Sequence, residues 1–167
     1  MKRNPITHHR RSIRLKNYDY AQIGVYFITI CCEGGKCRFG TIENGEMFLN
    51  DAGKIAFDEW EKTPNKRSNI QIDAFVIMPN HTHAIITIRR GVLHTPLRSP
   101  SQTVGSIVRG YKSAVTKQLK QLGFERSIWQ RNYYERIIHN CTAYQHVVDY
   151  IQNNPVHWKN DDFFTKN

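Results

Sequence analysis

Residues 70–88 read IQIDAFVIMPNHTHAIITI, and this stretch decides how the chain folds. Its first part, Ile70 to Met78, carries mostly apolar, β-branched and aromatic residues, which predicts a buried strand. Pro79 and Asn80 then turn the chain, and His81 to Ile88 predicts a second strand. Because the turn is this short, the second strand returns antiparallel beside the first. The sequence therefore predicts an antiparallel pair of strands with two histidines at the start of the second.

The segments on both sides of this pair supply the remaining elements. Asn44-Gly45 between two short apolar runs is a strong hairpin signal. Pro64 and Pro155 are expected to end helices, because proline lacks the amide hydrogen that a helix interior needs. In chain order the expected elements are a strand at 25–31, a hairpin at 39–49, a helix from Asn50 or Asp51 to about Lys62, the strand pair, a helix at 103–122, a strand at 128–138 and a helix from Thr142 to about Asn153.

This order of elements predicts the fold class. Without the hairpin it is βαββαβ followed by one more helix, which is the ferredoxin-like split βαβ arrangement. We expect an α+β fold with an antiparallel sheet, an inserted hairpin and a C-terminal helix that carries functional side chains. A length of 167 residues favours one domain, at residues 17–160, between a basic arm at 1–16 and a tail at 161–167.

Composition excludes several classes of protein. No apolar run approaches the ~20 residues of a membrane helix, and no hydrophobic stretch follows the basic N-terminus as in a secretory signal. We therefore expect a cytoplasmic protein with no membrane partner. The four cysteines are expected to be reduced thiols, because adjacent Cys31 and Cys32 point to opposite faces of a strand and fit neither a disulfide framework nor a zinc knuckle.

Basic residues are unevenly distributed along the chain. Lys and Arg number 24 against 14 Asp and Glu, a formal charge of +10, and residues 74–124 contain no acidic residue at all. We expect one electropositive face that binds phosphates. The alternative is that the basic residues at 89–120 lie on a solvated helix face and those at 2–16 in a disordered tail. The residues expected to bind phosphate are Arg10, Arg11, Arg14, Lys16, Arg89, Arg90, Arg109, Lys112 and Lys117.

His81 and His83 are candidate metal ligands. On a strand, residues two apart share a face, so both imidazoles can reach one cation while Thr82 points to the other face. Two histidines leave coordination positions open, as a catalytic metal requires, and a third ligand must come from elsewhere in the chain. The alternative is that both side chains only pack or face solvent.

The last predicted helix presents a second set of polar side chains. His146, Tyr150 and Asn154 are spaced four residues apart and line one side of it. Tyr150 is a candidate nucleophile, since a nearby metal would favour its phenolate, and Asn154 is a candidate donor of an amide oxygen to that metal. The alternative for Tyr150 is packing. Of the other tyrosines, Tyr111 either packs in the core or stacks on a base. Tyr133 and Tyr134 adjoin Trp129 in an aromatic segment and either pack on the sheet or stack on nucleobases.

Four motifs, in this order, resemble one known family. They are YDYAQIGVYFITI at 18–30, FVIMPNHTHAII at 75–86, WQRNYYERIIHN at 129–140 and VVDYIQNNPVHW at 147–158. The sequence is similar to the REP-associated tyrosine transposases, relatives of the single-tyrosine HUH transposases of IS200-like insertion sequences. Thr82 departs mildly from the family pattern, which has a bulky hydrophobic residue between the histidines.

The resemblance implies a bacterial, nucleoid-associated transposase whose partner is single-stranded or hairpin DNA. It implies that His81 and His83 bind Mg²⁺ or Mn²⁺ with Asn154 as third ligand. Tyr150 would cut single-stranded DNA and form a 5′-phosphotyrosine, and the basic residues above would contact DNA. A catalytically inactive hairpin-binding regulator and a nuclease that uses water are the alternatives, and the protein would be a monomer or a homodimer.

Overall fold

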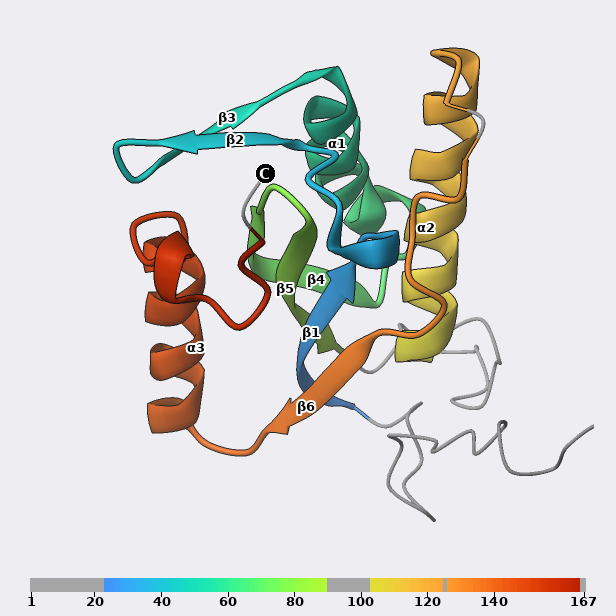
Figure 1. The fold of residues 1–167 in the computed structure, drawn as a ribbon. Coiled ribbons are helices and arrows are strands. Elements are labelled where there is room, and N and C mark those ends of the chain that lie inside the picture. Colours follow the sequence, from blue (N-terminus) through green and yellow to red (C-terminus); the bar gives the residue numbers. More distant parts are fainter. Residues whose placement is uncertain (1–22, 90–102, 125, 166–167) are drawn as a thin grey trace, which may run out of the picture.

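A four-stranded antiparallel sheet forms the centre of the molecule (Figure 1). The computed structural model describes residues 23–89, 103–124 and 126–165, so the expected arm at 1–16 lies outside the described residues. The strands are β1 (Gly24–Cys31), β4 (Ile70–Ile77), β5 (His81–Ile88) and β6 (Tyr134–Ile138), in the order β4-β5-β1-β6. β5 lies between the parallel strands β1 and β4, and β1 lies between β5 and β6, so the split βαβ prediction is confirmed.

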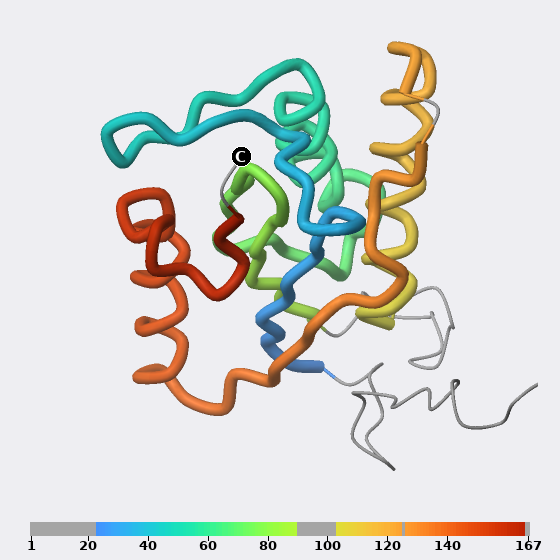
Figure 2. Tube along the Cα trace, viewed as in Figure 1, coloured from blue at the N-terminus to red at the C-terminus, as the bar shows by residue number. Residues whose placement is uncertain are grey.

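Helices cover both faces of this sheet (Figure 2). Helices α1 (Asp51–Lys66) and α2 (Val104–Gln121) share one face and enclose the larger core, where the rings of Trp60 and Tyr111 stack 4.0 Å apart. Helix α3 (Cys141–Asn153) lies on the other face over a smaller apolar cluster that includes Ile85 and Ile151. The sheet therefore separates α2 from α3, which matters for the placement of the basic residues.

The predicted hairpin forms a small sheet of its own. Strands β2 (Gly40–Glu43) and β3 (Glu46–Leu49) pair through a two-residue turn at Asn44 and Gly45. Both turn residues have positive φ, 52° and 81°, as a type I′ turn requires. The tip of the hairpin lies next to Val156, just beyond α3. A Cβ atom added to Gly45 would be 3.5 Å from the Cα atom of Val156.

Three element boundaries differ from the sequence prediction. Helix α1 continues through Pro64 to Lys66. Pro64 lies in the last turn, where its missing amide hydrogen removes one helical hydrogen bond without ending the helix. Strand β6 begins at Tyr134, and the expected strand residues before it form only one bridge, between Trp129 and Cys32. The N-cap of α3 is Asn140, whose side chain accepts from the Ala143 amide 2.8 Å away.

A β-bulge at Asp73 changes the alternation along β4. Ile72 pairs with Ile86 and Ala74 with the preceding residue of β5, so Asp73 is an extra residue. Its carboxylate accepts a hydrogen bond from Thr87 Oγ1. Burial, followed by the charge of Asp73, raises the pKa of Tyr144, so the bulge lies near the first half of α3.

The cysteines were expected to be reduced thiols, and no helix was expected to span a membrane. Cys31, Cys32, Cys37 and Cys141 are all free. Within residues 23–89, 103–124 and 126–165, no helix combines the length and the apolar character needed to cross a membrane.

Candidate active site

His81 and His83 lie side by side on the face of β5 that α3 covers. Their Nε2 atoms are 3.0 Å apart, and their rings meet edge to face with centroids 4.5 Å apart. Thr82 points to the opposite face, where its Oγ1 accepts from Trp60 Nε1 at 3.0 Å in the larger core. The prediction that the two imidazoles share a face is confirmed.

Asn80 fixes the protonation of the His81 ring. Its Nδ2 donates to the carbonyl oxygens of Gly35 and Phe163 at 3.1 and 2.7 Å, and lies 3.3 Å from Thr165 Oγ1. The amide oxygen Oδ1 is therefore the atom that faces His81 Nδ1, 2.8 Å away. An oxygen at this position accepts a hydrogen, so Nδ1 carries the proton and Nε2 keeps its lone pair. That lone pair is what a metal ion would bind.

Both imidazoles are neutral in this environment. His81 and His83 are 0% and 1% exposed. Burial lowers the pKa of His81 to about 3, and burial together with the neighbouring His81 lowers the pKa of His83 well below its usual value. The Nδ1 atom of His83 lies 2.8 Å from Thr29 Oγ1, and its ring stacks on Phe27 at 5.2 Å. The pair is preorganised as two neutral nitrogen donors.

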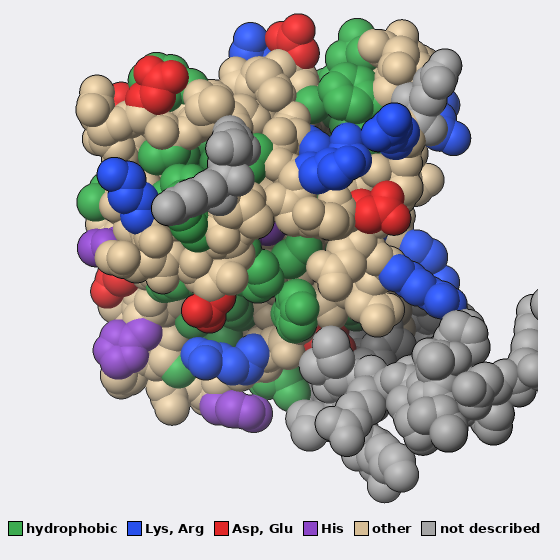
Figure 3. Space-filling view, in the orientation of Figure 1, with side chains coloured by type: hydrophobic (Ala, Val, Ile, Leu, Met, Phe, Trp, Pro, Cys, Tyr) green, Lys and Arg blue, Asp and Glu red, His purple; other side chains and the backbone are tan. Residues whose placement is uncertain are grey.

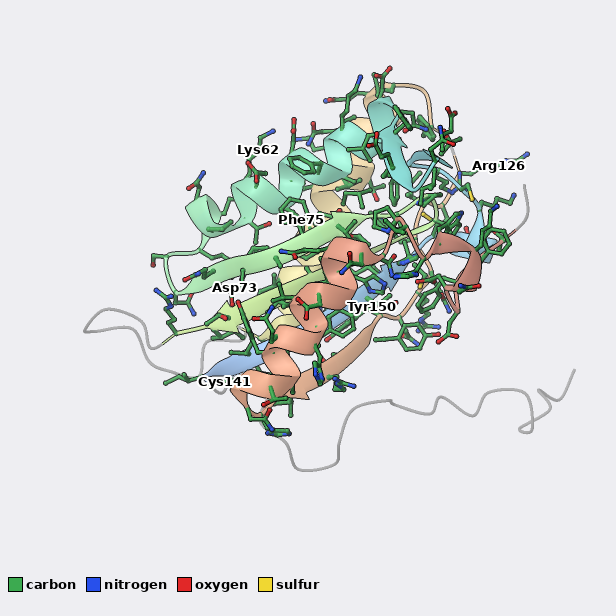
Figure 4. All side chains as sticks on the ribbon, turned by 90° about the vertical axis from the view of Figure 1, so that its left-hand side faces the viewer. Lys62, Asp73, Phe75, Arg126, Cys141 and Tyr150 are labelled. Atoms are coloured by element: carbon green, nitrogen blue, oxygen red, sulfur yellow. The ribbon has the colours of Figure 1, made fainter. Side chains whose placement is uncertain are left out.

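Helix α3 carries Tyr150 (Figure 4) and brings its hydroxyl to this pair. The phenolic oxygen lies 3.3 Å from His83 Nε2, and the ring meets that of Phe27 edge to face. The side chain is 44% exposed, so one side of it remains open to solvent. Burial, followed by the negative charge of Asp161, raises the pKa of Tyr150 to about 12. The phenol therefore keeps its proton at neutral pH.

Asp161 is the site residue that the sequence analysis missed. Its Oδ2 accepts from the hydroxyl of Tyr150 at 3.1 Å and from Asn154 Nδ2 at 2.9 Å. One ligand atom from each of His81, His83 and Asp161 lies within 4.8 Å of the others. In the sequence Asp161 falls in the expected tail at 161–167, whereas the short helix η4 (Trp158–Asn160) turns the chain back onto the site.

Asn154 differs from the expectation in how it faces the site. It is 2% exposed and caps α3 one turn after Tyr150. Its amide nitrogen, not its oxygen, is directed at the Asp161 carboxylate, and its Oδ1 has no hydrogen-bond partner. The orientation follows from charge, since an amide oxygen in that position would repel the carboxylate. His146, expected on the same side of the helix, is exposed.

The C-terminal segment at residues 161–165 lies over the histidines. Phe163 packs on His81 with ring centroids 4.8 Å apart, and Trp158 packs there at 6.0 Å. A cavity of about 150 Å³ opens beside Tyr150 and is lined by Tyr150, Asn154, His157, Asn160, Asp161 and Asp162. A second of about 220 Å³ lies on the other side of the segment, next to Asn80 and Tyr134.

Among the described residues, the basic side chains expected to bind phosphate do not gather around this site. Arg109 and Lys117 are exposed on α2, across the sheet from α3, and Arg89 follows the far end of β5. Lys112 donates to the carbonyl oxygens of Gln130 and Asn132 at 2.7 and 2.9 Å, and burial lowers its pKa to about 8. Its ammonium group therefore holds the segment before β6. Arg10, Arg11, Arg14, Lys16 and Arg90 lie outside the described residues.

Comparison with known proteins identifies the family. The family described as "Transposase IS200 like" matches residues 44–154, which include His81, His83 and Tyr150. The chain belongs to this family. Its resemblance to the REP-associated tyrosine transposases is thereby confirmed at the level of the family, and so is a transposase-like, DNA-processing role.

Individual relatives agree with this assignment. An uncharacterized protein of Haemophilus influenzae is 45% identical, over 98% of this chain and 97% of the relative. The REP-associated tyrosine transposase of Escherichia coli is 34% identical over 52% of this chain, and the match spans 44% of that protein. A solved structure of a REP-associated tyrosine transposase bound to a REP hairpin is 26% identical, with a TM-score of 0.61 over 86% of this chain and 73% of that one.

Proposed function

We propose that this IS200-like transposase is a metal-dependent endonuclease and strand transferase for single-stranded DNA, with Tyr150 as its nucleophile. The observation that carries the proposal is the 3.3 Å separation between the Tyr150 hydroxyl and Nε2 of His83. Both groups belong to one chain, and a nucleophile this close to the metal ligands would be within reach of a phosphate held at that metal. A tyrosine that only packed would not keep its hydroxyl between a metal-ligand nitrogen and a carboxylate.

His81, His83 and Asp161 would hold the divalent ion, Mg²⁺ or Mn²⁺. The donor set fits such an ion, because two neutral imidazoles and one carboxylate each place a ligand atom within 4.8 Å of the others. When bound, the ion would polarise the scissile phosphate and stabilise charge on the leaving oxygen. Asn154, expected as the third ligand, instead positions Asp161 through its amide nitrogen.

The reaction would proceed by in-line attack on phosphorus. The Tyr150 oxygen forms a bond to the phosphorus atom while the bond from phosphorus to the 3′ oxygen breaks. The products are a 5′-phosphotyrosine and a free 3′-hydroxyl, so the energy of the ester bond is kept for rejoining. The phenolic proton has an acceptor in place, Asp161 Oδ2 at 3.1 Å, and the leaving 3′ oxygen takes a proton from solvent to become the hydroxyl. In the reverse step the same carboxyl group returns that proton to the phenol.

The proposed substrate is hairpin DNA with single-stranded flanks. The solved relative with a bound REP hairpin supports this substrate class. Exposed Arg89, Arg109 and Lys117, with Arg10, Arg11, Arg14, Lys16 and Arg90, would contact phosphates of the hairpin stem. Since α2 lies across the sheet from Tyr150, these contacts would hold the stem and not the phosphate that is cut.

A labelled hairpin oligonucleotide with single-stranded flanks tests the proposal. The protein is incubated with it and Mn²⁺ or Mg²⁺, and the products are separated on a denaturing gel. We expect a covalent protein–DNA band that disappears in Tyr150→Phe and without the divalent ion. Tyr144→Phe is the matched control, because it removes a hydroxyl from the same helix at its contact with Asp73, away from the histidines.

Two other outcomes would replace this mechanism. Cleavage that persists in Tyr150→Phe without a covalent band would indicate a nuclease that activates water. Tight binding of the hairpin with no cleavage under any metal would indicate a catalytically inactive hairpin-binding regulator.

A further inference from the structure

Helix α3 covers only part of the sheet face that carries the histidines. It packs mainly on β4 and β5 and reaches Phe27 of β1 through Tyr150, whereas β6 forms the opposite edge of the sheet, beside β1. Along β6 the side chains alternate. Ile137 packs in the core beneath α1 and α2, and Ile138 packs in the cluster beneath α3. Tyr134 and Arg136 therefore lie on the same face as the histidines, and both are exposed.

The strand register connects these two side chains to the active site. Tyr134 pairs with Thr29 and Arg136 pairs with Phe27 across β1 and β6. Thr29 Oγ1 lies 2.8 Å from His83 Nδ1, and the Phe27 ring stacks on His83 at 5.2 Å. One residue of β1 thus separates each β6 side chain from His83. Since neighbouring strands are about 4.8 Å apart, β6 lies roughly 10 Å from the strand that carries the histidines.

The exposure of Tyr134 calls for an explanation. Tyr26 and Tyr111, which pack in the larger core, are 0% and 3% exposed, whereas Tyr134 is 43% exposed. The ring touches Phe163 on one side, with centroids 5.9 Å apart. A charged residue such as Arg136 also protects an edge strand from pairing with another chain. Protection of the edge by Arg136 does not explain why the ring of Tyr134 is exposed to solvent.

We propose that this face of β6 binds the single-stranded DNA flank next to the scissile phosphate. Tyr134 stacks on an unpaired base and Arg136 contacts a backbone phosphate, the combination by which proteins bind single strands. The inference rests on the proposed function and names the path of its substrate. Hydrophobic side chains lie open between α3 and β6, with a basic side chain beside them (Figure 3). A strand crossing β1 onto β6 would leave its neighbouring phosphate at Tyr150.

Binding without cleavage tests the path separately from the chemistry. Fluorescence anisotropy is measured with Tyr150→Phe in EDTA, on a hairpin with flanks and on the same hairpin without them. We expect Tyr134→Leu to bind the flanked hairpin about 5- to 150-fold more weakly and Tyr134→Trp to bind it normally. Arg136→Gln should lower the slope of log affinity against log salt by about 0.7. All variants should bind the hairpin without flanks as the parent does.

Lys62→Gln is the matched control for loss of charge. Lys62 lies on α1, across the sheet from Tyr150 (Figure 4), and is exposed. A second measurement needs no variant. A flank carrying 5-iododeoxyuridine is photocrosslinked to the parent protein, and the modified peptide is identified by mass spectrometry. We expect the adduct on β6 at or beside Tyr134.

The possible results separate the two proposals. Unchanged affinity of Tyr134→Leu and Arg136→Gln for the flanked hairpin, or an equal loss without flanks, would overturn the path. A crosslink confined to α2 would do the same. Binding as expected together with no nicking in Mn²⁺ would overturn the proposed reaction and leave the path in place. A parent protein that binds neither hairpin would overturn both.

Discussion

Replacing Asn80 with alanine should weaken metal binding without touching a metal ligand. The substitution removes the oxygen that accepts from His81 Nδ1 at 2.8 Å, so the ring is free to adopt the other tautomer and to rotate. Loss of such an outer hydrogen bond typically costs 10- to 100-fold in metal affinity, about 1.4 to 2.8 kcal/mol. We expect the dissociation constant for Mn²⁺, measured by isothermal titration calorimetry, to rise by that factor.

The same variant should also destabilise the fold, and a companion variant separates the two effects. Asn80 is 1% exposed, and its Nδ2 has three acceptors in Gly35, Phe163 and Thr165. With the bond to His81 this makes four interactions, worth about 2 to 6 kcal/mol of unfolding free energy together. Asn80→Asp keeps the acceptor but loses the donor, so it should lose stability in urea and keep its affinity for Mn²⁺. A wild-type dissociation constant in Asn80→Ala would refute this account of the tautomer.

Three further outcomes are expected. Because burial lowers the pKa of His81 to about 3, the unfolded chain binds an extra proton between that pH and about 6.5. The free energy of unfolding should therefore decrease as the pH is lowered across this window, by up to about 1.4 kcal/mol per pH unit. When urea midpoints are compared, this dependence on pH should be smaller in His81→Gln. Gly53→Ala should destabilise α1 despite alanine's higher helix propensity, because the new Cβ would lie 2.1 Å from the Phe39 carbonyl oxygen; thermal melts check the sign. Asp161→Asn should weaken Mn²⁺ binding by calorimetry and lower the pKa of Tyr150, seen as an earlier rise in phenolate absorbance that is missing in a Tyr150→Phe background.

The elements were predictable from the sequence wherever their signal is local. Strand β5 has the predicted bounds, His81–Ile88, because a proline turn and β-branched residues mark them within one stretch of chain. The relation of Tyr150 to Asn154 also follows from helical spacing alone. The start of β6 was wrong because Trp129 and Ile128 are apolar for another reason. They are buried against the main core, and Trp129 forms one isolated bridge, to Cys32 just beyond β1.

Two features of the site depend on contacts between distant residues and leave no trace in local patterns. Asp161 reaches His83 only because η4 reverses the chain and Phe163 packs on His81, some eighty positions away in the sequence. The acid-free run at 74–124 suggested one basic face, yet it includes both β5 and α2. Right-handed crossovers place α1 and α2 together on one face of the sheet, so α3 must take the other. Charge counted along a chain does not record which face a helix occupies.

The assembly of the site within one chain has a consequence for how the protein responds to dilution. His81, His83, Tyr150 and Asp161 belong to the same molecule, and their contacts require no second copy. A site shared between two subunits would be lost as the protein is diluted below its dimerisation constant, whereas this one is complete in a single molecule. The specific rate of the proposed nicking step should then be independent of protein concentration, even at the few copies of a protein that a cell keeps at low expression.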